Sequence, residues 1–192
     1  MKTILLYILS IFIIPHYVAF RVSKRKFELV DDINVMNQKS HFNASMLVSL
    51  TYHLLVNKYY RNVFYKRLGR WSNFLFFYLP SQSTFDPCCS QIGGGIYCAH
   101  PFSTILNAKS IGKNFSCRNN TTIGNKRDGG KAIPIIGNNV TLGANVCIIG
   151  DIVIGNNVIV GAGSVVVKSV PDNCIVAGNA AYIIRRIETH KQ

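Results

Sequence analysis

The chain of 192 residues contains five histidines, at positions 16, 41, 53, 100 and 190. Imidazole can take a proton from an alcohol near neutral pH, so a well-placed histidine would suit transfer of a group to a hydroxyl. His100 is the only one of the five inside the repeat described below. Cys98 would share its side of a strand and is a rival as nucleophile. No third, orienting group stands nearby, so the sequence favours His100 as a general base.

A repeat with a step of six residues must position this histidine. Aliphatic residues recur at that step: Ile136, Leu142, Ile148, Ile154, Val160 and Val166. A second row follows four residues behind each, from Val140 to Val170, and the first row continues upstream: Ile105, Ile111, Cys117 and Ile123. Such a step is neither that of a helix nor that of an ordinary strand. It predicts a solenoid of short parallel strands whose repeated residues point inward.

Glycine and asparagine mark the expected corners, as in Gly137-Asn138-Asn139 and Gly155-Asn156-Asn157. Both residue types enter left-handed backbone conformations at low cost, which we expect to be the reason for their presence. Between Ile123 and Ile136 the step widens, because the polar stretch 124–134 is inserted there. Its charges cannot enter an apolar core, so we expect an external loop that lines a binding site.

The strings IGGGIYCAHPFSTILN, TIGNKRDGGKAIPIIGNNVTLGANVCIIGDIVIGNNVIVGAGSVV and VPDNCIVAGNAAYII resemble those of left-handed β-helix acyltransferases. Within that family they are most similar to serine acetyltransferases and to O-acetyltransferases of surface polysaccharides, over residues 90–185. The resemblance implies a mainly β fold: a left-handed parallel β-helix with an N-terminal α-helical region and a short C-terminal helix. It also implies acetyl-CoA as the donor and a homotrimer with sites between subunits.

The resemblance assigns roles to single residues. His100 matches the family's general base, and the matched donor-binding positions are Gly124, Asn125, Ala144 and Ala162. Small side chains suit these positions, because backbone amides can then reach a ligand. Lys126, Arg127, Lys131 and Lys168 are candidates for the phosphates of coenzyme A, or are solvated surface charges. We expect Tyr97 and Lys131 to face the acceptor.

The acceptor is where the chain departs from serine acetyltransferases. Those enzymes carry an acidic residue before the base and an Arg-His pair in the loop, groups suited to an amino acid's ammonium and carboxylate. The matching residues here are Ala99, Ala132 and Ile133. Asp86 lies one residue out of register with another family acid, so we give it no role. We therefore expect a sugar hydroxyl of a surface polysaccharide as acceptor, with serine as the alternative.

The N-terminal region points to a membrane. An apolar run from Leu5 to Phe20 contains Pro15 and His16 and is followed by Arg21, Lys24, Arg25 and Lys26. It is marginal in length for a span, and its basic flank favours a cytoplasmic chain at the inner face of the plasma membrane. A buried helix and a cleaved signal peptide are the alternatives. The basic and aromatic stretch 57–80 favours contact with anionic lipid over nucleic acid, or else a helical subdomain.

Composition sets the outer limits. Hydrophobic residues make up 48% of the chain and the net charge is +13, which suits a globular protein and not a disordered one. Six cysteines without a CxxC pair indicate free thiols. We expect a membrane-associating segment at 1–26, a helical region at 27–80, the β-helix at 81–178 with its loop at 124–134, and a C-terminal tail or helix at 179–192.

Two other functions are consistent with a solenoid. A metal enzyme would need about three histidines around a zinc-type ion, and the repeat contains one, so we expect no metal. A non-catalytic membrane adaptor would use the solenoid as a spacer and would not bind coenzyme A.

Overall fold

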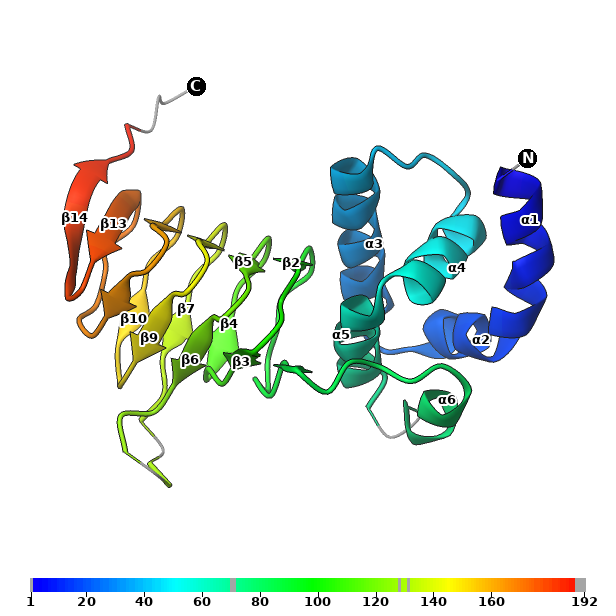
Figure 1. Ribbon diagram of the computed structural model, residues 1–192, viewed down its shortest axis with the longest axis horizontal. Coiled ribbons are helices and arrows are strands. Elements are labelled where there is room, and N and C mark those ends of the chain that lie inside the picture. Colours follow the sequence, from blue (N-terminus) through cyan, green and yellow to red (C-terminus); the bar gives the residue numbers. More distant parts are fainter. Residues whose placement is uncertain (1, 70–71, 128, 131, 189–192) are drawn as a thin grey trace. The chain divides into compact units, whose positions relative to one another are not determined.

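The structure is a computed structural model that describes residues 2–69, 72–127, 129–130 and 132–188. The chain forms two compact units, Met1–Ser83 and Thr84–Gln192. The first is helical and the second is a β-solenoid (Figure 1). The division falls three residues beyond the boundary expected after residue 80. Lys131, expected at the acceptor, lies outside the described residues.

The helical unit is built from α1 (Lys2–Leu9), η1 (Ser10–Ile13), α2 (Ile14–Val22), α3 (Lys26–Ser40), α4 (Met46–Val56), α5 (Lys58–Leu68) and α6 (Ser72–Tyr78). Its core is apolar and includes Leu29, Ile33, Leu50, Leu54 and Phe64, all fully buried. The apolar N-terminal run is therefore not one straight helix. A 3-10 turn bends it between α1 and α2 (Figure 1).

Helix α5, in the first part of stretch 57–80, packs into the helical bundle. It buries Arg61 and Arg67 inside the bundle, where the Nε and NH2 groups of Arg67 donate to the Asp32 carboxylate at 2.6 and 3.0 Å. The Arg61 guanidinium donates to the carbonyls of Leu54 and Leu55, in the last turn of α4, where a cation is favoured by the helix dipole. This helix belongs to the core of a helical subdomain, the alternative noted from the sequence.

The solenoid has three faces, which the chain visits in turn, and all its strands pair in parallel except β14. The first face holds β1 (Phe85–Asp86), β3 (Thr104–Leu106), β6 (Thr122–Gly124), β9 (Cys147–Ile149) and β12 (Val165–Val166). The second holds β4 (Ser110–Ile111), β7 (Ile135–Ile136) and β10 (Val153–Ile154). The third holds β2 (Tyr97–Ala99), β5 (Ser116–Arg118), β8 (Thr141–Leu142), β11 (Ile159–Val160), β13 (Cys174–Gly178) and β14 (Ala181–Arg186).

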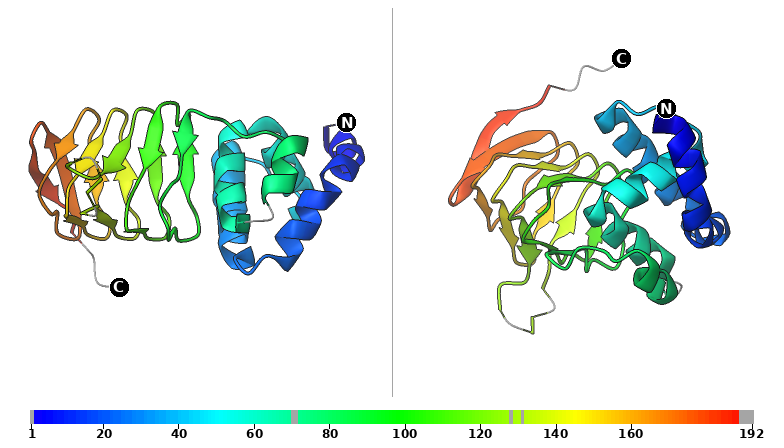
Figure 2. Two further views of the ribbon diagram at one scale, coloured as in Figure 1. Left: turned by 90° about the horizontal axis from the view of Figure 1, so that it is seen from below. Right: turned by 45° about the vertical axis from the view of Figure 1, so that its right-hand side comes forward.

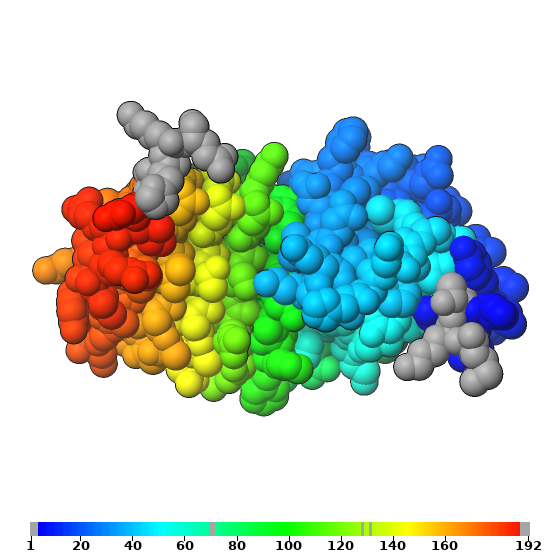
Figure 3. Space-filling model, turned by 90° about the horizontal axis from the view of Figure 1, so that it is seen from above, coloured from blue at the N-terminus to red at the C-terminus, as the bar shows by residue number. Residues whose placement is uncertain are grey.

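The six-residue repeat is confirmed as the source of the core. All six residues from Ile136 to Val166 are buried, and so is the second row from Val140 to Val170. The coils lie side by side (Figure 2) and form successive bands on the surface of the solenoid (Figure 3). The insertion after β6 projects outward as expected (Figure 1). In the described part of the chain no disulfide joins any of the six cysteines.

Two details of the repeat were wrong. Ile105, six positions before Ile111, is 48% exposed, and Leu106, five positions before Ile111, points inward instead. The corner glycines also serve another purpose. A Cβ on Gly137 would lie 2.7 Å from the carbonyl carbon of Gly155 on the next coil, so close stacking requires glycine there. At the corner between the second and third faces, asparagines from Asn114 to Asn173 take the left-handed conformation, Asn139 with φ 54°.

Those asparagines form a ladder along one edge of the solenoid. The amide of Asn114 donates to Asn139 at 2.9 Å, Asn139 donates to Asn157 at 2.9 Å, and Asn157 donates to Asn173 at 2.8 Å. Each side-chain amide thereby hydrogen-bonds the side-chain oxygen of the asparagine on the next coil, while the left-handed backbone of each residue forms the turn. The ladder fixes the edge between the second and third faces.

The expected C-terminal helix is wrong, because residues 181–186 form strand β14. The strand pairs antiparallel with β13 after the chain reverses at Gly178, whose φ is 109°. The open edge of β13 offers backbone partners, and the β-branched Ile183 and Ile184 fit a strand better than a helix.

Candidate functional site

His100 lies in a corner of the solenoid that is wider than its counterpart on the next coil. Ala99 pairs with Arg118 before the corner, and Ile105 pairs with Thr122 after it. The corner between β2 and β3 therefore contains two more residues than the corner between β5 and β6 on the next coil. The amide of Asn120 donates to the carbonyl of Phe102 at 2.9 Å, which restores the register. Residues 100–102 thus occupy the place that Asn119 alone has on the next coil.

The local backbone turns His100 away from the strand that precedes it. His100 and Ser103 both have left-handed conformations, with φ 50° and 51°, and the amide of Phe102 donates to the His100 carbonyl at 2.7 Å. Left-handed conformations are uncommon outside glycine and often mark functional positions. The imidazole is exposed, so a substrate hydroxyl can reach it.

Phe102 is a residue that the sequence reasoning missed. It stands in the same widened corner, two residues after His100, and its ring is 56% exposed. An apolar ring held beside a base offers a surface on which a substrate can rest. The signal was present in the sequence, since the step from the inward Cys98 to the inward Leu106 is eight positions, whereas the repeat has a step of six.

Two of the expected donor residues share the edge of His100. Ala144 and Ala162 stand at the same corner on successive coils, since the amide of Asn145 donates to Asn119 at 3.0 Å and that of Gly163 to Ala144 at 2.8 Å. With coils about 4.8 Å apart, Ala144 and Ala162 lie about 10 and 14 Å along this edge from His100. Along the edge between the third and first faces, Ala162, Ala144 and Asn119 thus follow one another toward the candidate base.

The other donor residues lie on a different edge. Gly124 ends β6 and pairs with Ile149, and Lys168 follows β12 at the corresponding corner two coils later. These residues, with Asn125, mark the edge between the first and second faces. The first face separates them from His100, so the structure does not bring all the expected residues together within one chain. Tyr97 is half-buried at the start of β2.

Both edges leave room for a ligand. An added Cβ at Gly124 or Gly163 would meet no other atom within 4 Å, so neighbouring protein atoms do not require glycine there for packing. Ala162 is exposed. At the base of the external loop, Asn125 donates its side-chain amide to the Arg127 carbonyl, and Lys126 and Arg127 are exposed. These features fit an extended, anionic ligand.

The cysteines near the site are poor nucleophiles. The Sγ of Cys98 lies 3.4 Å from that of the fully buried Cys117, so its thiol faces the core and not His100. Cys147 lies on the first face, and burial raises the pKa of its thiol above the usual value. A raised pKa keeps that thiol protonated near neutral pH. Within the described ranges, no three His, Cys, Asp or Glu residues group as metal ligands.

Comparisons with known proteins agree with this architecture. Residues 133–168 match the family model described as bacterial transferase hexapeptide (six repeats). The Escherichia coli (strain K12) protein named "Putative colanic acid biosynthesis acetyltransferase WcaB" is 48% identical over 95 residues, which are 49% of this chain and 59% of that protein. The chain thus spans less than two thirds of this relative.

Solved structures extend the likeness to the helical unit. The serine acetyltransferase (CysE) of Neisseria gonorrhoeae is 27% identical with a TM-score of 0.67, over 86% of this chain and 68% of that one. A Brucella abortus strain S19 serine acetyltransferase, solved in complex with coenzyme A, shares the fold at 24% identity and a TM-score of 0.66, over 90% and 73%. Residues 133–168 of the solenoid thus match the hexapeptide repeat of the bacterial transferase family, and the chain is similar to WcaB and to serine acetyltransferases.

Proposed function

We propose that the chain is an acetyl-CoA-dependent O-acetyltransferase that uses His100 as its general base. The observation that carries this proposal is the widened corner, which exposes His100 at the end of an edge lined by Ala144 and Ala162. Similarity to WcaB and to serine acetyltransferases supports the reaction class. A Brucella abortus serine acetyltransferase of the same fold binds coenzyme A, which supports the donor.

The reaction is a direct transfer. His100 takes the proton of the acceptor hydroxyl as its oxygen attacks the thioester carbonyl, and the carbon–sulfur bond then breaks to release the acetyl ester. The leaving thiolate of coenzyme A takes up a proton. The inward direction of Cys98 supports a route without an acetyl-cysteine intermediate.

The separation of the two edges supports sites between subunits of a homotrimer. Within one chain, Gly124 and Lys168 lie across the first face from His100. A second subunit could bring its own copy of that edge to the His100 edge of the first. Ile105 and Val167 expose apolar surface near these edges, which a neighbouring subunit would cover.

For the acceptor we propose a sugar hydroxyl of a surface polysaccharide. Ala99, Ala132 and Ile133 offer no charge to an amino acid's ammonium or carboxylate, whereas the exposed Phe102 offers a flat apolar surface to a sugar ring. The WcaB similarity points the same way. Serine is the second candidate, because the likeness to the Neisseria gonorrhoeae enzyme covers most of this chain.

The base is tested by His100→Asn. Asparagine tolerates the left-handed backbone at this position but cannot act as a base near neutral pH, so the corner should stay intact. Activity should fall by about a hundredfold or more. His41→Asn is the matched control, since His41 also has φ 50° and lies at the C-terminus of α3. Full activity in the His100 variant would refute the mechanism.

The acceptor is tested by the loss of acetyl-CoA thioester with serine, nucleotide sugars and lipid-linked sugars in turn. We expect the highest kcat/KM with a sugar. Faster turnover with serine would replace the first acceptor by the second while leaving the His100 mechanism standing. No turnover with any acceptor, together with no binding of coenzyme A, would favour the non-catalytic adaptor.

A further inference from the structure

The N-terminal helices expose a continuous apolar stripe. Ile4, Ile8, Ile11, Val18 and Val22 follow one another at helical spacing and are all exposed, Val22 by 69%. Ile4–Val22 is also long and apolar enough to cross a membrane by length and composition, although a core helix or a signal sequence would pass the same test. An exposed apolar stripe of this size on a folded unit marks an interaction site for a membrane or for another protein.

The opposite side of the same helices is held by the protein. Ile13, His16 and Phe20 are fully buried, and the Nε2 atom of His16 lies 3.1 Å from the Tyr65 hydroxyl of α5. Removing this segment to span a bilayer would break that contact and expose part of the helical core. The segment is therefore built to remain in its bundle and to present one side only.

Helix α6 adds an aromatic patch. Phe74, Phe77 and Tyr78 are exposed, Phe77 by 89%. The Tyr65 hydroxyl that meets His16 also donates to the Leu79 carbonyl at 2.6 Å, so α2 and the end of α6 meet at one side chain. Aromatic rings of this kind favour the boundary between lipid and water.

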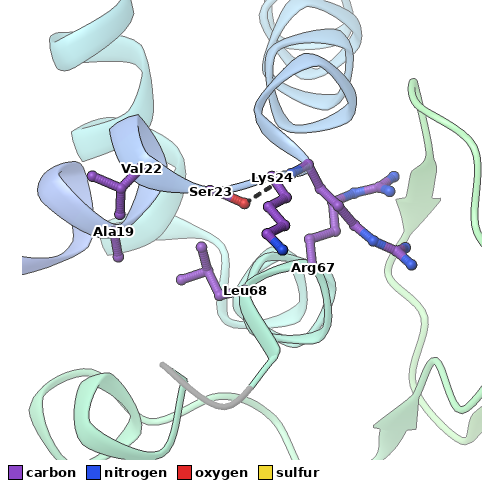
Figure 4. Close-up of a pocket in the computed structure, with 7 residues that line it drawn as sticks. Ala19, Val22, Ser23, Lys24, Arg67 and Leu68 are labelled. Carbon is purple, nitrogen blue, oxygen red and sulfur yellow. Dashed lines mark hydrogen bonds between the residues drawn. The ribbon is translucent and has the colours of Figure 1, made fainter.

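A basic pocket lies where the apolar stripe ends. It has a volume of about 370 Å³ and is lined by Ala19, Val22, Ser23, Lys24, Arg25, Arg67 and Leu68. Figure 4 shows Lys24 extending over the pocket toward α5, with the apolar Ala19 and Val22 on the neighbouring α2. Arg67 is already paired with Asp32, so Lys24 and Arg25 are the charges offered to a ligand. The whole unit is also basic, with eleven lysines and arginines against three acidic residues in 1–83.

We propose that the helical unit docks on the surface of a bilayer that contains anionic phospholipid. The stripe and the α6 patch enter the interfacial layer, while the pocket at the end of α2 receives a lipid phosphate. Cations beside an apolar surface match an anionic headgroup beside acyl chains. The unit lies on the membrane and does not cross it, because its inner side is committed to the bundle. This inference does not depend on the acetyltransferase activity.

Flotation of the full chain with vesicles tests the proposal. We expect strong binding to vesicles of phosphatidylcholine with phosphatidylglycerol and weaker binding to phosphatidylcholine alone. Phe77→Ser should lower the partition coefficient at least about tenfold, since a large side chain no longer enters the lipid. Tyr182→Ser is the matched control, an aromatic ring that is 68% exposed on β14 of the solenoid. Equal binding of wild type and Phe77→Ser would overturn the proposal.

The electrostatic part is tested separately. Lys24→Gln should lower binding to the anionic vesicles about fivefold, with no change for vesicles of phosphatidylcholine alone. Lys109→Gln, an exposed lysine of the solenoid, should leave binding unchanged. Equal effects of the two substitutions would remove the role of the pocket and overturn the proposal as stated.

Two further measurements separate other uses of this surface. An alkaline carbonate wash of membranes from expressing cells should release the chain, and retention would show a spanning helix instead. Sedimentation without vesicles should give the same mass for wild type and Phe77→Ser. A lower mass in the variant, with no vesicle binding by the wild type, would show that the surface joins two copies of the chain and would overturn the proposal.

Discussion

Acid should destabilise the helical unit through two buried histidines. Burial lowers the pKa of His16 from 6.5 to about 4, and the Arg61 guanidinium acts in the same direction. Burial alone lowers the pKa of His53 to about 4 as well. His53 contacts the Asn37 side chain through Nε2 at 2.8 Å, while Nδ1 of His16 has no hydrogen-bond partner among the described groups. Protonation of either histidine would place a positive charge inside the helical bundle, and the lowered pKa values show that the folded chain disfavours it.

The direction and size of the effect follow from linkage. Between pH 6.5 and 4 the unfolded chain binds a proton that the folded chain does not, so stability falls as the pH is lowered through this range. With pKa values of 6.5 unfolded and about 4 folded, each histidine costs about 2 kcal/mol between about pH 7.5 and about pH 5. Full stability is present above pH 6.5.

The assay is denaturant unfolding of the helical unit, followed by circular dichroism at 222 nm and by fluorescence of Trp71, the only tryptophan. His16→Gln is neutral at every pH, so its loss of stability between the two pH values should be about 2 kcal/mol smaller than that of the wild type. The comparison uses the pH dependence, so any constant cost of the substitution cancels. His41→Asn, on an exposed site, should behave as the wild type. An unchanged pH dependence in His16→Gln would refute the reasoning.

Three further predictions concern packing and substrate binding. Gly137→Ala should destabilise the solenoid by about 2 kcal/mol or more in denaturant melts, because its Cβ meets Gly155. Gly124→Ala should change stability by less than about 0.5 kcal/mol and raise the KM for acetyl-CoA; equal losses of stability in the two variants would contradict this. Asp32→Leu should cost about 3–5 kcal/mol by leaving the Arg67 charge buried and unpaired, and an added Arg67→Met should recover most of it; no recovery would contradict the reason given. Phe102→Ala should raise the KM for the acceptor but not for acetyl-CoA in steady-state assays, and a change in both would place the ring elsewhere in the site.

The sequence by itself determined the solenoid. Aliphatic residues that recur every six positions can all be buried only if the chain forms short strands that stack coil upon coil. The inward positions from Ile136 to Val166 follow from that condition alone. The external loop followed in the same way, since its charges cannot enter the core. The period did not reveal why glycine stands at Gly137, because the distance between neighbouring coils is a property of the stacked structure.

Only the tertiary structure decided which of the expected site residues share an edge and which side of the N-terminal helices is exposed. The repeat shows which residues point inward but not which face or edge of the solenoid each residue occupies. It therefore could not show that Gly124 and Lys168 lie on a different edge from His100. It also could not place the two additional residues in the corner of His100. The apolar run is hydrophobic all round, and composition cannot distinguish its two sides. The contact between His16 and Tyr65 makes that distinction, because residues 49 positions apart in sequence meet only when the bundle has folded.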